Sequence, residues 1–320
     1  MAIKRKIRLG VIMDPLSIIL KEHDTTLAIL EEAEKRQWEI YYMEQKDLFF
    51  KEGKTFGVMQ QLKLSLNKNP WYKIQKQIIK PLNFCDAILM RKDPPFNMEY
   101  IYTTYLLELA EKESVLVVNN PQSLRDANEK MFSSWFPDIC PPTLITRNIS
   151  QHLEFLNAHH DIVVKPLDLM GGKSIFRLRT NDDNANVILE TLTQKNTKTI
   201  MSQKFIPENK KGDKRVILID GKPIPFGLVR IPAPGDFRGN LSSGASSKIQ
   251  KLTKHDYGIC EQVGPILKKK GLSFVGIDII GNYLTEINVT SPTGIREIEA
   301  GCDINISGLL LEFIERTLSS

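Results

Sequence analysis

The sequence has few cysteines and no long apolar run, and both shortages exclude classes of protein. Its four cysteines lie far apart, with no Cys-x-x-Cys pair and no regular spacing to histidine; they are Cys85, Cys140, Cys260 and Cys302. They predict neither a zinc site nor a disulfide framework and are typical of reduced thiols in a cytosol. No run approaches the roughly 20 apolar residues that a membrane helix needs. The basic start is followed by an apolar run that Arg8 interrupts and Asp14-Pro15 ends, unlike a signal peptide. We therefore expect a cytoplasmic protein that does not enter a membrane.

The chain also lacks a concentration of charge of one sign. Its 320 residues carry a net charge of +5, but the basic clusters at 4–6, 210–211 and 268–270 are short and separated by acids. Such scattered charge is typical of a solvated surface, so we do not expect nucleic-acid binding. With 42% hydrophobic and 25% charged residues, the composition is that of a folded globular protein. The length suffices for two or three subdomains.

The first part of the chain alternates strand-like and helix-like segments. The expected strands are 7–13, 39–43, 87–90 and 115–119, and the expected helices are 25–36 and 98–113. Asp24 is placed to cap the first helix. This alternation favours a small parallel sheet with helices on its faces.

The rest of the chain is richer in hairpins. The expected strands are 162–165, 174–178, 199–205, 215–219 and 223–231, and the expected helices are 183–195, 256–270 and 306–318. Asp220-Gly221 favours positive φ and predicts a hairpin turn. Residues 232–247 are rich in Gly, Ser and Pro, which predicts a mobile loop that closes over a site.

The segment 274–289, FVGIDIIGNYLTEINV, is the most informative. Residues two apart in a strand share a face, so Glu286 and Asn288 point the same way. A three-residue turn at 281–283 would place Asp278 directly across from Glu286, whereas a two-residue turn would place it on the other face. Two carboxylates and one amide oxygen together would suit Mg²⁺. Surface acids on a hairpin are the alternative, but two carboxylates among apolar neighbours would repel each other without a cation.

Basic residues and glycines that suit phosphate recur near the ends of predicted strands. Lys165 ends an apolar run, where its point charge can hold a polyphosphate, and Lys130 ends the segment SLRDANEK; a structural role is the alternative for either lysine taken alone. Gly171-Gly172 permit close approach of backbone amides to phosphate, although a glycine pair is also a common hairpin turn. Four arginines can bind carboxylates or phosphates with paired hydrogen bonds, or form surface ion pairs; they are Arg215, Arg230, Arg238 and Arg296.

Together these segments resemble the ATP-grasp fold, and their wording resembles prokaryotic glutathione synthetases more closely. The family's strings occur in order: MDP (13–15), MRKDPPF (90–96), NPQSLRDANEK (120–130), KPLDLMGG (165–172), GDKR (212–215), RIPAPGDFRGNL (230–241), FVGIDIIG (274–281) and LTEINVTSPTGIREIEA (284–300). The resemblance covers almost the whole chain. Two departures stand out: Leu169 replaces a glycine of the glycine-rich loop, and residues 244–248 replace a Gly-Gly-Arg-Gly run, so the arginine of the substrate lid is missing.

The resemblance implies a role for each matching residue. Lys130 and Lys165 match the phosphate-binding lysines, with Gly171 and Gly172 in the glycine-rich loop. Gln203, Lys204, Phe205 and Ile206 match the segment that holds adenine, and Asp213 matches the ribose contact. Asp278, Glu286 and Asn288 match the metal ligands. Arg215 and Arg230 match the residues that stabilise the transferring phosphoryl group, and Arg238, Asn240, Ser291 and Thr293 fall where the peptide substrate is held.

The resemblance also implies an activity and an architecture. The expected reaction joins γ-glutamylcysteine to glycine through an acyl phosphate, using ATP and Mg²⁺, or Mn²⁺ as an alternative metal, in a homo-oligomer (dimer or tetramer). The expected α/β (α+β) architecture has an N-terminal parallel α/β domain at 1–122, a small ATP-grasp lobe at 123–203 and a C-terminal lobe at 204–320 that carries the metal site and the lid loop 232–247. Two alternatives stay open: another ATP-grasp peptide or amino-acid ligase, and a non-catalytic ATP-binding regulatory protein.

Overall fold

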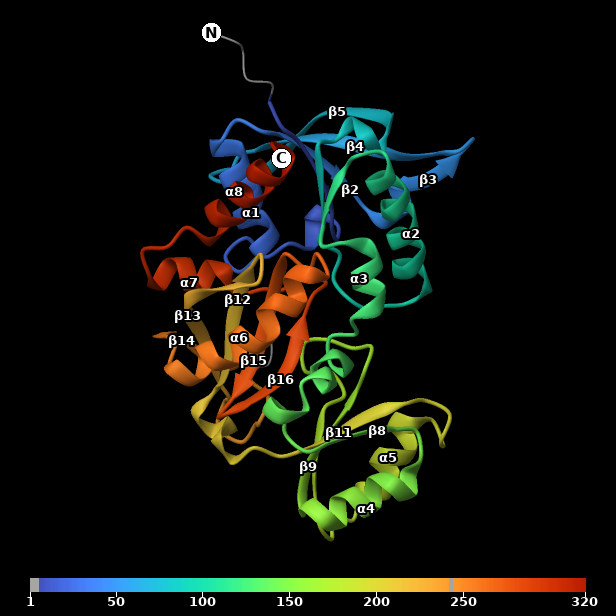
Figure 1. Ribbon diagram of the computed structural model, residues 1–320, viewed down its shortest axis with the longest axis vertical. Coiled ribbons are helices and arrows are strands. Elements are labelled where there is room, and N and C mark those ends of the chain that lie inside the picture. Colours follow the sequence, from blue (N-terminus) through green and yellow to red (C-terminus); the bar gives the residue numbers. More distant parts are fainter. Residues whose placement is uncertain (1–5, 242–243) are drawn as a thin grey trace.

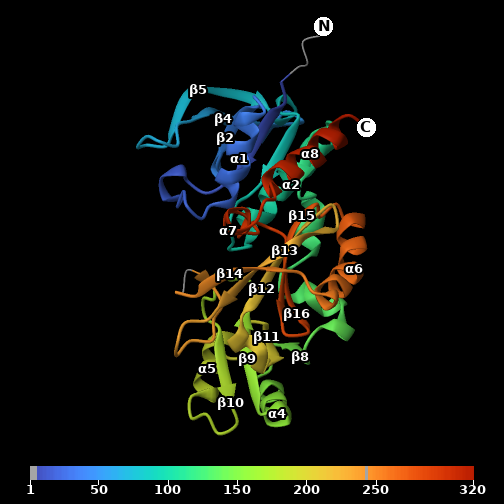
Figure 2. The ribbon, with the colours of Figure 1, turned by 90° about the vertical axis from the view of Figure 1, so that its left-hand side faces the viewer.

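Three β-sheets follow one another along the long axis of the molecule in the part of the chain that the structure describes (Figure 1). The structure is a computed structural model, and it describes residues 6–241 and 244–320. The N-terminal sheet lies at one end, a small lobe lies at the other, and the third sheet lies between them; Figure 2 shows the same order from the side. Among the described helices, none combines the length and the apolar content that crossing a bilayer requires.

The N-terminal sheet has a parallel centre, as the sequence predicts. Its parallel strands are β1 (Arg8–Ile12), β2 (Glu39–Met43), β6 (Ala87–Met90) and β7 (Leu116–Val118), in the order β2-β1-β6-β7. The helices of this part are α1 (Thr25–Lys35), α2 (Met98–Lys112) and α3 (Pro121–Asp126). The side chain of Asp24 accepts a hydrogen bond from the backbone of Leu27, which confirms the predicted cap.

An antiparallel extension of this sheet was missing from the sequence prediction. It consists of β3 (Leu48–Lys51), β4 (Lys54–Leu64) and β5 (Tyr72–Pro81). β4 joins the extension to the parallel strands by pairing with β2, β3 and β5. Its positions alternate between more and less buried, but the residues of KTFGVMQQLKL do not alternate between apolar and polar in the same way, so periodicity gave only a weak signal.

The small lobe is a four-stranded antiparallel sheet in the described chain, with two helices on it. Its elements are β8 (Thr143–Thr146), α4 (Ile149–His159), β9 (Asp161–Pro166), β10 (Phe176–Arg179), α5 (Ala185–Thr193) and β11 (Ile200–Lys204), and the strand order is β10-β9-β11-β8. Leu156, Ile162, Leu178 and Leu189 belong to its separate apolar core. The lobe therefore has its own core, and β9 delivers Lys165 at its end.

The third sheet carries the predicted metal hairpin. Its elements are β12 (Asp213–Ile219), β13 (Lys222–Ile231), β14 (Ser246–Lys251), β15 (Phe274–Ile280) and β16 (Tyr283–Asn288), ordered β14-β13-β12-β15-β16 and antiparallel throughout, with α6 (Lys254–Lys269) and α7 (Ile295–Gly301). The loop predicted at 232–247 ends earlier than expected, because residues 246 and 247 already pair in β14. Positions 242 and 243 of that loop lie outside the described residues.

The last helix returns to the first sheet. α8 (Ile306–Leu318), which the sequence predicts with the same bounds, packs against α1 at the N-terminal end of the molecule (Figures 1 and 2). Arg36, which follows α1, donates hydrogen bonds to the Gly308 carbonyl and to Glu315 of this helix. The segment that begins in the third sheet therefore ends on the N-terminal one. Short 3-10 helices complete the described chain: η1 (Leu16–Ile18), η2 (Gln45–Asp47), η3 (Leu82–Phe84), η4 (Met131–Trp135), η5 (Pro137–Ile139) and η6 (Pro207–Lys211).

Candidate active site

One cleft of about 840 Å³ gathers the residues that the sequence singles out. Its walls come from the small lobe, the third sheet and the carboxyl ends of β1 and β6. The predicted site residues that line it are Lys130, Lys165, Gly171, Gly172, Gln203, Lys204, Phe205, Ile206, Asp213, Arg215, Arg230, Arg238, Asn240, Asp278, Glu286, Asn288, Ser291 and Thr293. We call this space the central cleft.

The hairpin β15–β16 brings two carboxylates opposite each other, but not through the three-residue turn that would have paired them directly. Ile280 pairs with Tyr283, so the turn is Gly281-Asn282, and the three-residue turn is wrong. Pairing by that turn alone would set Asp278 against Thr285. A β-bulge shifts the register by one residue, so that Asp278 pairs with Glu286 instead. The expected pairing is thus confirmed, and the bulge produces it.

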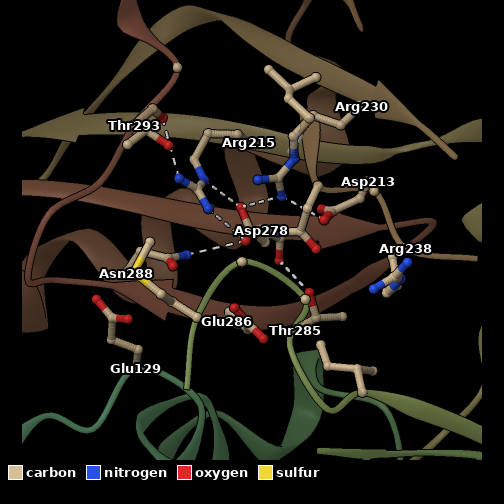
Figure 3. Close-up of a pocket in the computed structure, with 18 of the residues that line it drawn as sticks. Glu129, Asp213, Arg215, Arg230, Arg238, Asp278, Thr285, Glu286, Asn288 and Thr293 are labelled. Atoms are coloured by element: carbon tan, nitrogen blue, oxygen red, sulfur yellow. Dashed lines mark hydrogen bonds and ion pairs between the residues drawn. The ribbon is translucent and has the colours of Figure 1, made fainter. Parts of the chain in front are cut away.

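Two arginines hold Asp278 on this sheet (Figure 3). Arg215 Nε and Nη2 lie 2.5 and 2.9 Å from its two carboxylate oxygens, and Arg230 Nη2 lies 3.0 Å from Oδ1. Burial raises the pKa of Asp278, but Arg215 and Arg230 outweigh burial and hold it well below its ordinary value. Asp278 therefore carries a negative charge at neutral pH.

Two lysines approach Glu286 from the other wall of the cleft. Lys165 Nζ lies 3.3 Å and Lys130 Nζ 4.0 Å from its Oε1. Burial lowers the pKa of the Lys165 ammonium, and Glu286 opposes this effect. Lys130 Nζ also donates to the carbonyl of Leu169, 2.5 Å away, in the glycine-rich loop. These two cations are placed to exchange a carboxylate partner for an anionic ligand.

Asp213 is a carboxyl group of the cleft whose pKa lies near neutrality. Burial, opposed by the neighbouring Arg230 and assisted by the nearby charge of Asp278, raises its pKa to about 7. Its Oδ2 accepts from Arg230 at 2.5 Å, whereas its buried Oδ1 has no hydrogen-bond partner among the described residues. A polar ligand group can meet this oxygen.

The donor set on the hairpin fits a hard divalent cation. Asn288 uses its amide nitrogen to donate to Gly276 O and Asp278 Oδ2, at 3.1 and 3.2 Å, so its carbonyl oxygen is the atom left to serve the cleft. Within the described residues no group of three or more His, Cys, Asp and Glu forms a complete metal cage. Two carboxylates and one amide oxygen instead leave coordination positions for phosphate and water, as Mg²⁺ prefers.

The glycine-rich loop and the loop after β13 meet above the cleft. Gly172 has φ +75°, and a Cβ added to it would lie 2.5 Å from Asn240 Oδ1. Arg238 donates from Nε and Nη2 to Asp236, so in this structure its guanidinium is held at the loop itself. A side chain at this position would have to displace the Asn240 amide, and the positive φ itself favours glycine.

One of the four arginines forms an ion pair, which is the alternative that the sequence left open, and two sets of residues were missed. Arg296 does not line the central cleft; it donates to Glu31 and to the Asp24 carbonyl, so it fastens α7 to α1. The missed residues are Glu129, before η4, and the aspartates that follow β1 and β6, Asp14 and Asp93. Carboxyl ends of adjacent parallel strands at a change of strand order are the signal for the last two.

A small antiparallel lobe and the segment before it together offer lysines to carboxylates on a second antiparallel sheet, and this arrangement defines the ATP-grasp class of ligases. Solved structures show the same fold. The D-cycloserine synthetase DcsG is matched with a TM-score of 0.68 at 11% identity, over 96% of this chain and 99% of that one. The D-alanyl-alanine synthetase A of Vibrio cholerae is matched with a TM-score of 0.62 at 14% identity, over 99% and 100%.

Sequence comparison identifies the family within this class. Residues 7–125 match the N-terminal domain of prokaryotic glutathione synthetase, and residues 129–303 match its ATP-grasp domain. The glutathione synthetase of Coxiella burnetii is 53% identical over 309 residues, covering 97% of this chain and 96% of the relative. That of Pseudomonas putida is 51% identical over 314 residues, covering 98% and 99%. The chain belongs to the prokaryotic glutathione synthetase family.

Proposed function

We propose that this chain is an ATP-dependent carbon–nitrogen ligase that joins γ-glutamylcysteine to glycine and releases glutathione, ADP and phosphate. Full-length similarity to glutathione synthetases supports the choice of substrates. The observation that carries the chemistry is the placement of Asp278 and Glu286 across one cleft from Lys130 and Lys165. Opposed cations and carboxylates of this kind suit a metal-bound polyphosphate.

Magnesium, with manganese as an alternative, is the proposed resident cation. Asp278, Glu286 and Asn288 would hold it, since their oxygens form the hard donor set described above. When bound, the cation offsets negative charge on the phosphates and on the transferring phosphoryl group. The remaining chemistry depends on the side chains around it.

The protein acts mainly by positioning and by charge. Lys130 and Lys165 bind the phosphates of ATP, while a carboxylate oxygen of γ-glutamylcysteine attacks the γ-phosphorus and ADP leaves. Arg215 and Arg230 stabilise the charge of the resulting acyl phosphate from the sheet. The glycine amine then attacks the acyl carbon, phosphate leaves, and the amine proton passes to solvent or phosphate. The loops above the cleft exclude water, which would otherwise hydrolyse the acyl phosphate.

The other predicted residues divide between the nucleotide and the peptide. In this proposal Gln203, Lys204, Phe205 and Ile206 hold adenine, Asp213 meets the ribose, and the amides of Gly171 and Gly172 cover the phosphates. Arg238, Asn240, Ser291 and Thr293 hold the peptide, and the loop at 232–245 acts as its lid. Their common position around the central cleft supports this division. Residues 123–203 and 204–320 then act as the two lobes that close on ATP, with residues 1–122 as the third wall.

Phosphate release from the purified protein tests the function. We expect ATP-dependent release with γ-glutamylcysteine plus glycine, and little with D-alanine or glutamate in place of glycine. Glu286→Gln should reduce turnover by at least about a hundredfold, because the metal loses a charged ligand, while ATP still binds. A preference for another acceptor would indicate a different ATP-grasp ligase. ATP binding without turnover in the unaltered protein would indicate a regulatory protein instead.

We also propose a homo-oligomer in the cytoplasm. The outer face of α2 supports an assembly, because it exposes apolar side chains at helical spacing: Met98, Tyr102, Tyr105 and Leu109. Light scattering of the purified protein, compared with a Tyr102→Glu variant, would measure the oligomeric state and the part that this face takes in it.

A further inference from the structure

The proposed metal-binding strand β16 lies at the edge of the third sheet in the described chain, and one residue from the segment before η4 hydrogen-bonds to its open side. That residue is Glu129. Its backbone carbonyl accepts from the amide of Ile287 at 2.9 Å. Its Oε1 accepts from the amides of Val289 and Thr290, at 2.9 and 3.0 Å, and from the Thr290 hydroxyl at 2.7 Å. Glu129 therefore supplies the hydrogen bonds that a neighbouring strand would make.

These bonds act on the backbone that aims the proposed metal ligands. The amides of Ile287 and Val289 both donate to Glu129, and the residues on either side of Ile287, Glu286 and Asn288, line the central cleft. Holding both amides fixes the rotation of the strand about its own axis at this point. The directions of the two ligands are fixed with it.

The same residue is bonded in sequence to a phosphate-binding lysine. Lys130 follows Glu129, and its ammonium reaches the Leu169 carbonyl and approaches Glu286 within 4.0 Å. Figure 3 shows Glu129 entering the site from a segment separate from the hairpin and lying on the same side of the cleft as Asn288. One residue thus joins the segment that offers the lysine to the strand that offers the metal ligands.

We propose that Glu129 is a positioning residue for the ligase reaction. It sets the distance between Lys130 and the pair Glu286 and Asn288, and hence the distance between the nucleotide phosphates and the cation. It touches neither. This inference rests on the proposed function for the identity of the ligase substrates. The contacts of Glu129, however, affect only the sites proposed for the nucleotide and the metal.

Three variants test the proposal. Glu129→Ala removes the side-chain acceptor, Glu129→Gln keeps a carbonyl oxygen at the same place, and Asp126→Ala is the control, because Asp126 is a nearby acid whose carboxylate accepts from exposed Gln122. Loss of a residue that orients a metal ligand costs about 10- to 100-fold in metal affinity or activity. We expect Glu129→Ala to lose kcat by that factor while KM for γ-glutamylcysteine stays near the wild-type value. Glu129→Gln should restore most of kcat, and Asp126→Ala should resemble the wild type.

A binding measurement separates positioning from general damage. Binding of a fluorescent ADP is measured with Mg²⁺ and with a chelator, alongside thermal unfolding. We expect Glu129→Ala to bind ADP in chelator as the wild type does but to lose most of the strengthening by Mg²⁺. Equal behaviour of Glu129→Ala and Asp126→Ala would overturn the proposal. The proposal would also be overturned if Glu129→Ala lowered the melting temperature and weakened the binding of ADP and of the peptide together, with and without Mg²⁺. If the wild type fails to ligate glycine, the proposed function is wrong, and the metal-dependent ADP measurement still judges Glu129.

Discussion

The protonation of Asp213 makes the stability of the folded protein depend on pH. Its pKa is raised from 3.8 to about 7, because burial disfavours the charged form and Asp278 lies nearby. A carboxyl with a raised pKa in the folded state contributes stability that is complete below pH 3.8 and is lost as pH rises to about 7. The unfolded chain pays no such penalty for ionising this group.

We therefore expect Asp213→Asn, which cannot ionise, to gain melting temperature relative to the wild type between pH 5 and about 8 in the absence of nucleotide. The control is Asp236→Asn, since Arg238 holds the pKa of Asp236 at about 2, outside that range. The test is how the difference in melting temperature between Asp213→Asn and the wild type changes with pH. Its absolute value is not informative, because the variant also alters the hydrogen bond from Arg230. A difference that stays constant from pH 5 to about 8 would mean that Asp213 does not titrate there.

At the same scale, sequence could identify residue types but not partners. The roles of Lys130, Lys165 and Asp278 were inferred from matching strings, and those residues do meet in one cleft. Arg296 stood in an equally suggestive string, yet its partner is Glu31 on α1. Nothing local distinguishes an arginine that faces a cleft from one that faces another helix, since the partner lies 265 positions away along the chain.

Among the elements, predictability followed the length and regularity of apolar spacing. β2, β6 and α8 have the predicted bounds, because each is an uninterrupted strand or amphipathic helix. The bulge in β16 could not be predicted. Alternation with period two reveals which residues share a face, but an extra residue leaves no mark in composition. The sequence therefore leaves two turn lengths open. With the observed two-residue turn and no bulge, Asp278 would lie on the opposite face of the sheet from Glu286.

The contact between two loops above the cleft makes a prediction for Gly172. Gly172→Ala suffers in two ways: its φ of +75° disfavours a side chain, and the added Cβ would lie 2.5 Å from Asn240 Oδ1. Gly235→Ala is a matched control, because Gly235 has φ +85° with no atom within 4 Å of an added Cβ. We expect Gly172→Ala to reduce kcat/KM by about tenfold, whereas Gly235→Ala shows only the backbone effect.

The double variant Gly172→Ala with Asn240→Ala isolates the collision. Truncating Asn240 removes both of its atoms nearest the added Cβ, so the two changes together should cost less than the product of their separate effects. Steady-state kinetics of the four proteins gives this coupling. Independent effects, or equal losses for Gly172→Ala and Gly235→Ala, would contradict steric contact between the loops.

For the molecule as a whole, the C-terminal helix α8 packs against the N-terminal part of the chain, so that the three walls of the cleft are joined. α8 buries Ile306, Leu310, Leu311 and Ile314 in the apolar core that also contains the first strands. Burial of each such side chain contributes roughly 1.5–3 kcal/mol, and a domain's total stability is about 5–15 kcal/mol. The sequence predicts the helix but not its packing partner, because an amphipathic pattern does not identify the sheet or helix that the apolar face contacts. The N-terminal wall of the cleft thus depends on the last helix of the chain.

The charges of the central cleft predict that metal and nucleotide bind together. In this structure Asp278 is paired with Arg215 and Arg230, and Glu286 with Lys165. A divalent cation alone must therefore displace these cations and then lie beside them. When phosphates engage the lysines, the carboxylates become available, so each ligand strengthens the other by the same factor.

We expect weak Mn²⁺ binding to the nucleotide-free protein, measured by electron paramagnetic resonance, and at least about tenfold tighter binding of fluorescent ADP with Mg²⁺ than with a chelator. Lys165→Met gives a test with opposite signs: removing the cation beside Glu286 should strengthen Mn²⁺ binding without nucleotide and weaken ADP binding. Lys210→Met is the charge-matched control, because Lys210 is exposed on η6. If Lys165→Met weakens both ligands, or if the nucleotide-free wild type binds Mn²⁺ tightly, the carboxylates are not held by the lysines and arginines in the way that the structure implies.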